Sequence, residues 1–207
     1  MSQIFYVIRH SHGHPIGAAP PRSVGLQAAL DRELVAFPDD LPGFDRLVTG
    51  PGKLQATHAL TRALERSSYD EIVVVGTAGA IHEDVEATVH EVTAAIQHDV
   101  TDLDNVVGQH VSLPAMLSFG GSGHTIATGD HFVDDADVAA GIRDLGATLV
   151  DMEVYAYVWV AQQYDVPIRV LKAVSDRAQD GALSDWGEAT DACSVLLLER
   201  VRSDYGL

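Results

Sequence analysis

Four short stretches of the sequence carry residues that could do chemistry. They are TGPGK at residues 49–53, GTAGAI at 76–81, VDMEVYA at 150–156 and VSDRA at 174–178. The first is a glycine-rich turn before a helical pattern, where backbone N–H groups can bind an anion. It lacks the spacing of a Walker motif. The small residues of the second stretch would let a flat ligand approach the backbone.

Two carboxylates in these stretches are candidates for a functional role. Asp176 follows the apolar run VPIRVLKAV, where it could open a turn, cap a helix or act as a general acid if burial raises its pKa. Glu153 begins an apolar helical pattern, where a carboxylate is favourable in any protein. The same carboxylate could also bind vicinal hydroxyls of a sugar. Each stretch alone has a structural explanation, so its significance depends on whether all four converge.

The elements that would position these stretches alternate between strand and helix patterns. Apolar runs predict strands at 4–8, 45–50, 71–76, 124–130 and 166–174, one or two more within 84–100, and a strand leading into a helix at 147–154. Helical patterns cover 24–37, 54–67, 135–146, 153–165 and 186–203. The buried side of the helix at 54–67 is expected to carry Leu54, Ala59, Leu60, Ala63 and Leu64. This alternation predicts an α/β fold with a mostly parallel sheet covered on both faces. The carboxyl ends of its strands would share one edge, and without repeats or linkers we expect one domain over 1–207.

Composition and charge exclude several classes of protein. Thirteen basic and thirty acidic residues give a net charge of −17, which argues against nucleic-acid partners and anionic membrane surfaces. No apolar segment is long enough to span a membrane, and the N-terminus does not read as a signal peptide. The single cysteine, Cys193, lies in an apolar helical pattern and is expected to be a small buried side chain. These features predict a cytoplasmic protein.

Read in order, the motifs resemble those of the purine nucleosidase and nucleoside phosphorylase family. The stretches are LVTGPGK, IVVVGTAGAI, ATGDHFV and LVDMEVYAYVWVAQQYDVPIRVLKAVSDRA, from about residue 45 to about residue 190. They are most similar to methylthioadenosine/S-adenosylhomocysteine nucleosidases. The resemblance implies a mixed, partly closed β-sheet flanked by helices, and hydrolysis of a purine nucleoside, as in methionine salvage. It implies no metal and no cofactor, and it suggests a homodimer.

The resemblance also implies roles for particular residues. Asp176 would protonate or hydrogen-bond N7 of the leaving purine, and Ser175 would orient it. This agrees with the chemistry, because glycosidic cleavage pushes negative charge into the base. Met152 would pack on the ribose, and Glu153 would bind its 2′- and 3′-hydroxyls. Phe132 would stack on the base.

Further residues are implied around the base. Val133 would contribute backbone contacts, and Trp186 falls where the family often has an aromatic residue that closes over the purine. The segment formed by Thr77, Ala78 and Gly79 would line the purine side of the pocket.

The N-terminal fifth of the chain departs from the family's pattern. Nucleosidases of this family have a glutamate shortly after the first strand that activates the attacking water. Here the segment reads RHSHGHP, with no acid before Asp31. His14 or His12 could replace the glutamate, because a neutral imidazole can accept a proton from water. The alternative is that no base exists and the enzyme is slow, altered or inactive. This chain has DME where the family has EME, and Lys172 where the family has an arginine. Both differences point to altered specificity.

The histidine-rich stretch allows two other interpretations. Alternating histidines in HSHGH could bind a metal, but Gly13 and Pro15 favour a loop with no carboxylate or cysteine nearby. The stretch YVIRHSHGHP also resembles the opening of histidine phosphatases. That family needs a glycine where Ser11 stands and a second histidine late in the chain, yet no histidine follows His131.

Two alternative functions remain open within the same fold. A phosphorylase would hold phosphate with an arginine in a Gly-Asp-Pro-x-Arg turn, but GAAPPR at 17–22 has Arg22 without the aspartate. The turn at 50–53 favours water as the acceptor. A nucleoside-binding protein without turnover is the other alternative, motivated by the missing acid near the N-terminus.

Overall fold

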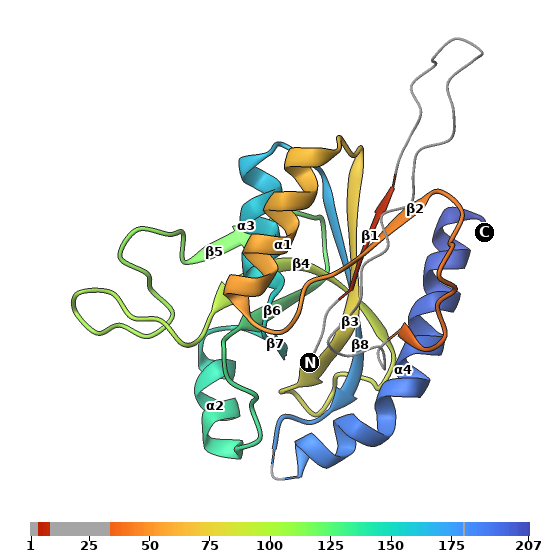
Figure 1. Cartoon of the computed structure of the whole chain (residues 1–207). Helices are drawn as coiled ribbons and strands as arrows, with labels where there is room; N and C mark the ends of the chain where they lie inside the picture. Colours follow the sequence, from red (N-terminus) through yellow and green to blue (C-terminus); the bar gives the residue numbers. More distant parts are fainter. Residues whose placement is uncertain (1–3, 9–33, 180) are drawn as a thin grey trace, which may run out of the picture.

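The computed structural model describes residues 4–8, 34–179 and 181–207, and of residues 4–8 only the backbone (Figure 1). Within these ranges an eight-stranded sheet is flanked by helices. The elements in chain order are β1 (Ile4–Ile8), β2 (Phe44–Val48), α1 (Lys53–Arg66), β3 (Glu71–Ala80), β4 (Val89–Gln97), β5 (Met116–Ser118), β6 (His124–Thr128), α2 (Ala136–Asp144), β7 (Leu149–Asp151), α3 (Val154–Gln163), β8 (Ile168–Asp176) and α4 (Ala182–Tyr205).

The sheet is mixed and partly closed. Its strand order is β2-β1-β3-β7-β6-β4-β5, and β8 pairs with both β3 and β4. The strands β3, β7, β6, β4 and β8 therefore form a closed circuit, which confirms the mixed, partly closed sheet that the resemblance implied. The expectation of a mostly parallel sheet was wrong, because β1 runs antiparallel to β2 and β3, and β4 runs antiparallel to β8. Continuous apolar runs report burial on both faces of a strand and do not report its direction.

Two parallel strand pairs meet end to end inside this circuit. One pair is β3 with β8, and the other is β6 with β7. The pairs join where β3 and β7 overlap antiparallel, with Gly79 opposite Val150 and Ala80 opposite Leu149. Because this overlap uses the last residues of β3, the carboxyl ends of both pairs face each other. The carboxyl ends of the strands were predicted to share one edge of a parallel sheet. They come together instead where these two strand pairs meet.

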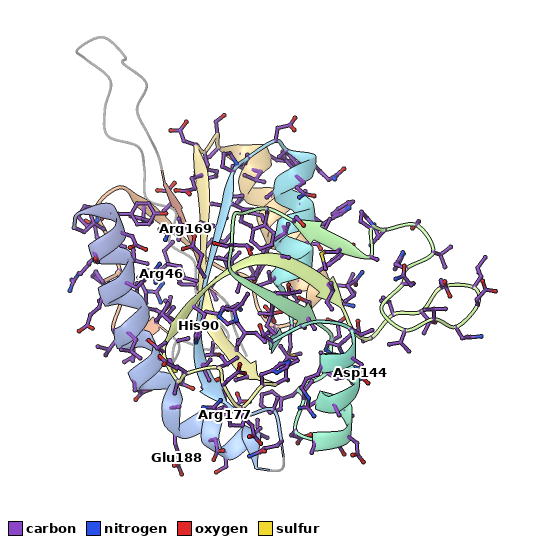
Figure 2. All side chains as sticks on the ribbon, turned by 180° about the vertical axis from the view of Figure 1, so that it is seen from behind. Arg46, His90, Asp144, Arg169, Arg177 and Glu188 are labelled. Atoms are coloured by element: carbon purple, nitrogen blue, oxygen red, sulfur yellow. The ribbon has the colours of Figure 1, made fainter. Side chains whose placement is uncertain are left out.

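Helices cover both faces of the sheet, as the view from behind in Figure 2 also shows. Figure 1 shows α1 and α3 side by side on one face and α4 on the opposite face, with α2 beyond the ends of β6 and β7. Seven of the ten residues of α3 are buried, as the apolar VYAYVWV pattern predicted. Cys193 of α4 is also buried, as expected. Leu54 was expected on the buried side of α1, but its side chain is 84% exposed.

Within the described residues, no helix has both the length and the apolar character needed to cross a bilayer.

The packing of α4 on the sheet gives a test of the fold. Leu197 is 1% exposed in the core between α4 and strands β3 and β8, whereas Leu183 on the same helix is 58% exposed. We expect Leu197→Ala to lower the free energy of unfolding by about 2–5 kcal/mol, because it leaves a cavity in a packed core. Leu183→Ala should change it by less than about 0.5 kcal/mol. Urea denaturation measures both, and equal effects would contradict this packing.

Candidate active site

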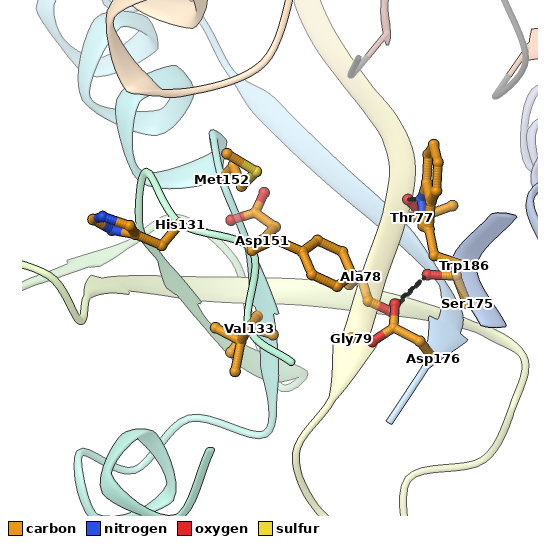
Figure 3. Close-up of a pocket in the computed structure, with 12 residues that line it drawn as sticks. Thr77, Ala78, Gly79, His131, Val133, Asp151, Met152, Ser175, Asp176 and Trp186 are labelled. Carbon is orange, nitrogen blue, oxygen red and sulfur yellow. Dashed lines mark hydrogen bonds between the residues drawn. The ribbon is translucent and has the colours of Figure 1, made fainter. Parts of the chain in front are cut away.

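A cavity lies where the carboxyl ends of the two parallel strand pairs meet (Figure 3). Strands β3, β7 and β8, the loop after β6 and the first turns of α4 all contribute to its wall. The lining residues are Thr77, Ala78, Gly79, His131, Phe132, Val133, Val150, Asp151, Met152, Ser175, Asp176 and Trp186. The wall thus combines aromatic and small apolar side chains with two carboxylates.

The end of β3 is shaped to let a carboxylate approach its backbone. The register between β3 and β8 shifts between Ala78 and Gly79, so that Gly79 pairs with Asp176. A Cβ atom at position 79 would lie 2.8 Å from the Asp176 Oδ1 atom. Only glycine therefore fits at this position. The stretch TAG continues strand β3 to Ala80, so the strand extends four residues beyond the predicted end at residue 76.

Asp176 is the last residue of β8, and its side chain is held by two short hydrogen bonds. The Ser175 hydroxyl donates to Oδ2 at 2.9 Å, drawn as the dashed line in Figure 3. The backbone N–H of Ala178 donates to Oδ1 at 2.9 Å. Asp176 does not cap the following helix, because α4 begins six residues later at Ala182.

Burial sets the acidity of this group. Asp176 is 6% exposed, and burial raises the pKa of its carboxyl above the ordinary value. The hydrogen bonds from Ala178 and Ser175 oppose this rise in pKa, and the negative charge of Asp185 adds to it. The net shift is upward, so the carboxyl keeps its proton to a higher pH than an exposed aspartate. Such a group can donate a hydrogen bond or a proton inside the cavity.

Asp151, the other carboxylate that lines the cavity, forms a buried ion pair with Lys172 behind the wall. The Nζ atom of Lys172 lies 3.0 Å from Oδ2 of Asp151, and both side chains are almost completely buried. Lys172 Nζ also donates to the carbonyl of Thr77 on β3. The Thr128 hydroxyl donates to Asp151 Oδ1, and the N–H of Val154 donates to Oδ2. One carboxylate therefore connects β6, β8 and the start of α3.

Glu153 lies next to the cavity and is not among its lining residues. It is fully buried, and its Oε1 atom accepts a hydrogen bond of 2.7 Å from the backbone N–H of Gly52. The adjacent Thr49 hydroxyl is hydrogen-bonded to the Tyr157 hydroxyl at 2.6 Å. The turn at 49–53 is thus attached to the first turn of α3. The glycine-rich pattern suggested that N–H groups of this turn bind an anionic ligand, but the Gly52 N–H binds the carboxyl group of a side chain of the protein.

Two aromatic side chains narrow the cavity. The indole N–H of Trp186 donates to the Thr77 hydroxyl at 3.1 Å, which holds α4 against β3. Phe132 contributes to the wall from the loop after β6. The cavity is partly open, and its volume is about 20 Å³, room for about one water molecule. A larger ligand can therefore enter only when side chains such as Trp186 and Phe132 move apart.

The cavity brings together most of the residues that the sequence singled out. Those that line it are Thr77, Ala78, Gly79, Phe132, Val133, Met152, Ser175, Asp176 and Trp186. Glu153 is displaced behind the wall, and His14 and His12 lie outside the described residues. In the described part of the chain, no three His, Cys, Asp or Glu side chains are grouped as metal ligands.

Sequence reasoning missed three lining residues: His131, Val150 and Asp151. Asp151 and Val150 stand directly before Met152, on a strand with alternating faces, and Asp151 gave the stronger signal. It is a carboxylate inside an apolar run, and Lys172 is a cation inside another. Buried charges of opposite sign are paired in folded proteins, so this pair could have been predicted.

Comparison with known proteins agrees with this geometry. Residues 123–201 match the model of the Phosphorylase superfamily. The chain is 32% identical over 197 residues to the 5′-methylthioadenosine/S-adenosylhomocysteine nucleosidase of Bacillus licheniformis, covering 79% of this chain and 84% of that protein. The corresponding enzyme of Bacillus thuringiensis is 30% identical over 155 residues, covering 64% of this chain and 67% of its own.

Solved structures show the same fold. The 5′-methylthioadenosine/S-adenosylhomocysteine nucleosidase of Helicobacter pylori superimposes with a TM-score of 0.74 at 20% identity, covering 85% of this chain and 94% of its own. Futalosine hydrolase of the same organism gives a TM-score of 0.75 at 18% identity, with the same two coverages.

The raised pKa of Asp176 predicts a pH-dependent cost in stability. The folded protein binds the proton of the Asp176 carboxyl more tightly than the unfolded chain does, so protonation stabilises the folded state. This stabilisation is complete below the pKa of the unfolded chain. The effect is lost as pH rises through the folded pKa. Asp176→Asn removes the titration, and its amide can donate to Ser175 Oγ and accept from Ala178 N. We expect the variant to gain stability relative to wild type between acidic and mildly alkaline pH. Urea denaturation of both proteins at an acidic and at a mildly alkaline pH measures their difference in free energy of unfolding. A difference that does not change with pH would contradict the raised pKa of Asp176.

Proposed function

Because this chain belongs to the 5′-methylthioadenosine/S-adenosylhomocysteine nucleosidase family, whose members are purine N-glycosyl hydrolases, we propose that it hydrolyses the N-glycosidic bond of such a nucleoside. The observation that carries the proposal is the buried Asp176 carboxyl, which lines a cavity shared with Phe132, Met152 and Trp186. A raised pKa at that position is what an acid for a leaving purine requires.

The base end of the site would work through Asp176. As the glycosidic bond lengthens, the sugar becomes oxocarbenium-like and negative charge moves into the purine. A protonated Asp176 would donate to N7 and neutralise that charge. Ser175 would hold the carboxyl in one orientation through its hydrogen bond to Oδ2. Phe132 and Trp186 would stack on or close over the base, and Thr77, Ala78, Gly79 and Val133 would border it.

The sugar end would use Met152 and Glu153. Met152 lines the cavity and would pack on the ribose. The hydrogen bond from Gly52 N–H to Oε1 fixes the Glu153 carboxylate in place beside the wall. When the cavity opens for a ligand, this carboxylate would accept from the 2′- and 3′-hydroxyls. The vicinal diol is well suited to a carboxylate acceptor.

The group that activates water is the least constrained part of the proposal. His14 is our candidate, and it lies in a segment that the structure does not describe. The Phosphorylase superfamily match keeps phosphate as an alternative acceptor, and ligand binding without turnover is a further alternative. We also propose that the protein acts in the cytoplasm and in methionine salvage.

A base-release assay tests the proposed reaction. We expect wild type to release adenine from methylthioadenosine without added phosphate, and Asp176→Asn to lower kcat by about 10²–10⁴-fold. The variant should still bind adenine, because its hydrogen bonds to Ser175 and Ala178 can be kept. Calorimetry with adenine is the control for binding.

Three outcomes would count against this reaction. Release of sugar phosphate only when phosphate is added would show a phosphorylase. Binding of methylthioadenosine without release of base would show a binding protein. Full activity of Asp176→Asn would remove the proposed acid.

We further propose that the protein is a homodimer. Six of the thirteen exposed large apolar side chains of the described residues lie at the start of α1, at the start of β5 and in the segment between β4 and β5, which extends away from the sheet in Figure 1. They are Leu54, Leu103, Val106, Val107, Val111 and Met116. Such a group of exposed apolar residues marks an interaction surface.

Sedimentation equilibrium tests the dimer. We expect the wild-type mass to be twice that of the 22.1 kDa chain. Leu103→Glu should shift the equilibrium towards the monomer, because a carboxylate would be buried in the interface. Glu199→Gln, on the outer surface of α4, is the control and should leave the mass unchanged. A monomeric wild type at micromolar concentration would contradict the proposal.

A further inference from the structure

Lys53, the first residue of α1, makes contacts that reach well beyond its own helix. Its Nζ atom donates to Asp99 Oδ1 at 2.5 Å and to Gln97 Oε1 at 3.0 Å, both at the end of β4. Its backbone N–H donates to Asp130 Oδ1 at 2.8 Å, in the loop after β6. One residue therefore joins the turn at 49–53 to two separate segments of the sheet.

The two acidic partners are also connected to each other. Asp99 Oδ2 accepts a hydrogen bond of 2.8 Å from the backbone N–H of Asp130. A Cβ atom at Gly52 would lie 2.9 Å from Asp130 Oδ1, so the turn needs glycine to approach this closely. We call the group Lys53, Gln97, Asp99 and Asp130 the Lys53 clasp.

Helix stability alone does not explain a lysine at this position. A cation at the N-terminus of a helix is opposed by the helix dipole. The first turn of α1 contains no acidic residue, and Gly52 provides no side-chain cap. The lysine is stabilised by its partners outside the helix, since the side chains of Lys53 and Asp99 are only 16% and 14% exposed.

The charge on Asp99 reflects the same arrangement. Burial raises the pKa of its carboxyl, but the hydrogen bonds from Lys53 and the Asp130 N–H outweigh burial, and the pKa lies below its usual value. Asp99 is therefore ionised across the neutral pH range and keeps its charge-assisted hydrogen bonds.

The clasp stands between the two ends of the proposed nucleoside site. On one side, Gly52 donates its N–H to Glu153, the proposed ribose acceptor. On the other, Asp130 stands two residues before Phe132, the proposed partner of the base. The first connection is a hydrogen bond from the backbone N–H beside Lys53, and the second is the chain itself between Asp130 and Phe132.

From this connection we propose that Lys53 is a positioning residue that fixes Glu153 and the Phe132 loop relative to each other. The inference depends on the nucleosidase function proposed above. Without the ammonium group, Asp99 and Asp130 repel each other with no cation between them, and the loop is held to the turn only by the backbone N–H of residue 53, so its attachment weakens. The enzyme then populates arrangements in which the sugar and base sites do not match, and substrate binding must select the matching one. Apparent affinity falls by the fraction of molecules that match.

Steady-state kinetics of Lys53→Met test this inference. We expect kcat/KM for methylthioadenosine to fall by about 10- to 100-fold, mostly through a higher KM. Lys53→Arg should recover a large part of the loss, because it keeps a cation that can reach Asp99. Asp99→Asn should resemble Lys53→Met, and the double variant should lose little more than either single variant.

Arg62→Met is the matched control, because it removes one positive charge from the same helix at an exposed position away from the cavity. It should leave KM and kcat unchanged. A purely structural role for Lys53 would reduce the amount of folded enzyme, which lowers kcat and leaves KM unchanged. That result, or wild-type kinetics for Lys53→Met, overturns the inference.

Calorimetry with adenine separates this inference from the proposed reaction. If wild type binds adenine without releasing it from nucleosides, the hydrolase proposal fails while the clasp remains testable. Lys53→Met should then bind methylthioadenosine, which occupies both the base site and the sugar site, about 10-fold more weakly or worse, and equal affinity overturns the clasp. If wild type neither binds adenine nor releases it, both proposals are overturned.

Discussion

The buried pair of Lys172 and Asp151 is the interaction on which the site depends. Its two members come from β8 and β7, strands of the two parallel pairs that meet at the cavity. Without the other, each parallel strand pair would leave the carboxyl ends of its strands uncovered. The ion pair, with the hydrogen bonds from Thr128 and Val154 to Asp151, holds the two ends at a fixed separation. Loss of one partner would leave an uncompensated buried charge, which typically costs about 3–5 kcal/mol.

The same cavity therefore contains two carboxylates in opposite electrostatic situations. Asp151 has a cation within 3.0 Å. Around Asp176, burial raises the pKa of the carboxyl, and the hydrogen bonds from Ala178 and Ser175 do not offset this rise. Enzymes use burial in this way to prepare a carboxyl group as an acid. Asp151 is part of the framework through its ion pair, and Asp176 can carry a proton.

The sequence predicted much of this arrangement, and its limits have physical causes. The long apolar helix at α3 and the strands β3 and β8 follow from burial patterns, and the order of motifs led to the family. Strand direction was mistaken, because an apolar run contains no information about it. Leu54 was placed inside because helical spacing alone defines a face without showing what covers it.

Part of the site was also predicted from the sequence, and part of it was not. Residues near strand ends were found because carboxylates and glycines interrupt apolar runs there, as at Gly79 and Asp176. The position of Glu153 depends on a contact with Gly52, which is 101 residues away in the chain, and no local pattern reports such a contact. The links from Lys53 to Asp99 and Asp130 span similar distances. Long-range polar networks are set by the tertiary fold and become visible only in three dimensions.

The hydrogen bond between Trp186 and Thr77 has a consequence for the kinetics of ligand capture. The resting cavity holds about one water molecule, so the indole and its neighbours must swing aside before anything larger enters. Association is then gated by this opening and falls below the diffusion limit. At high ligand concentration the observed rate should level off at the opening rate. Compounds that fill the cavity would therefore bind slowly and, once the indole has closed over them, leave slowly.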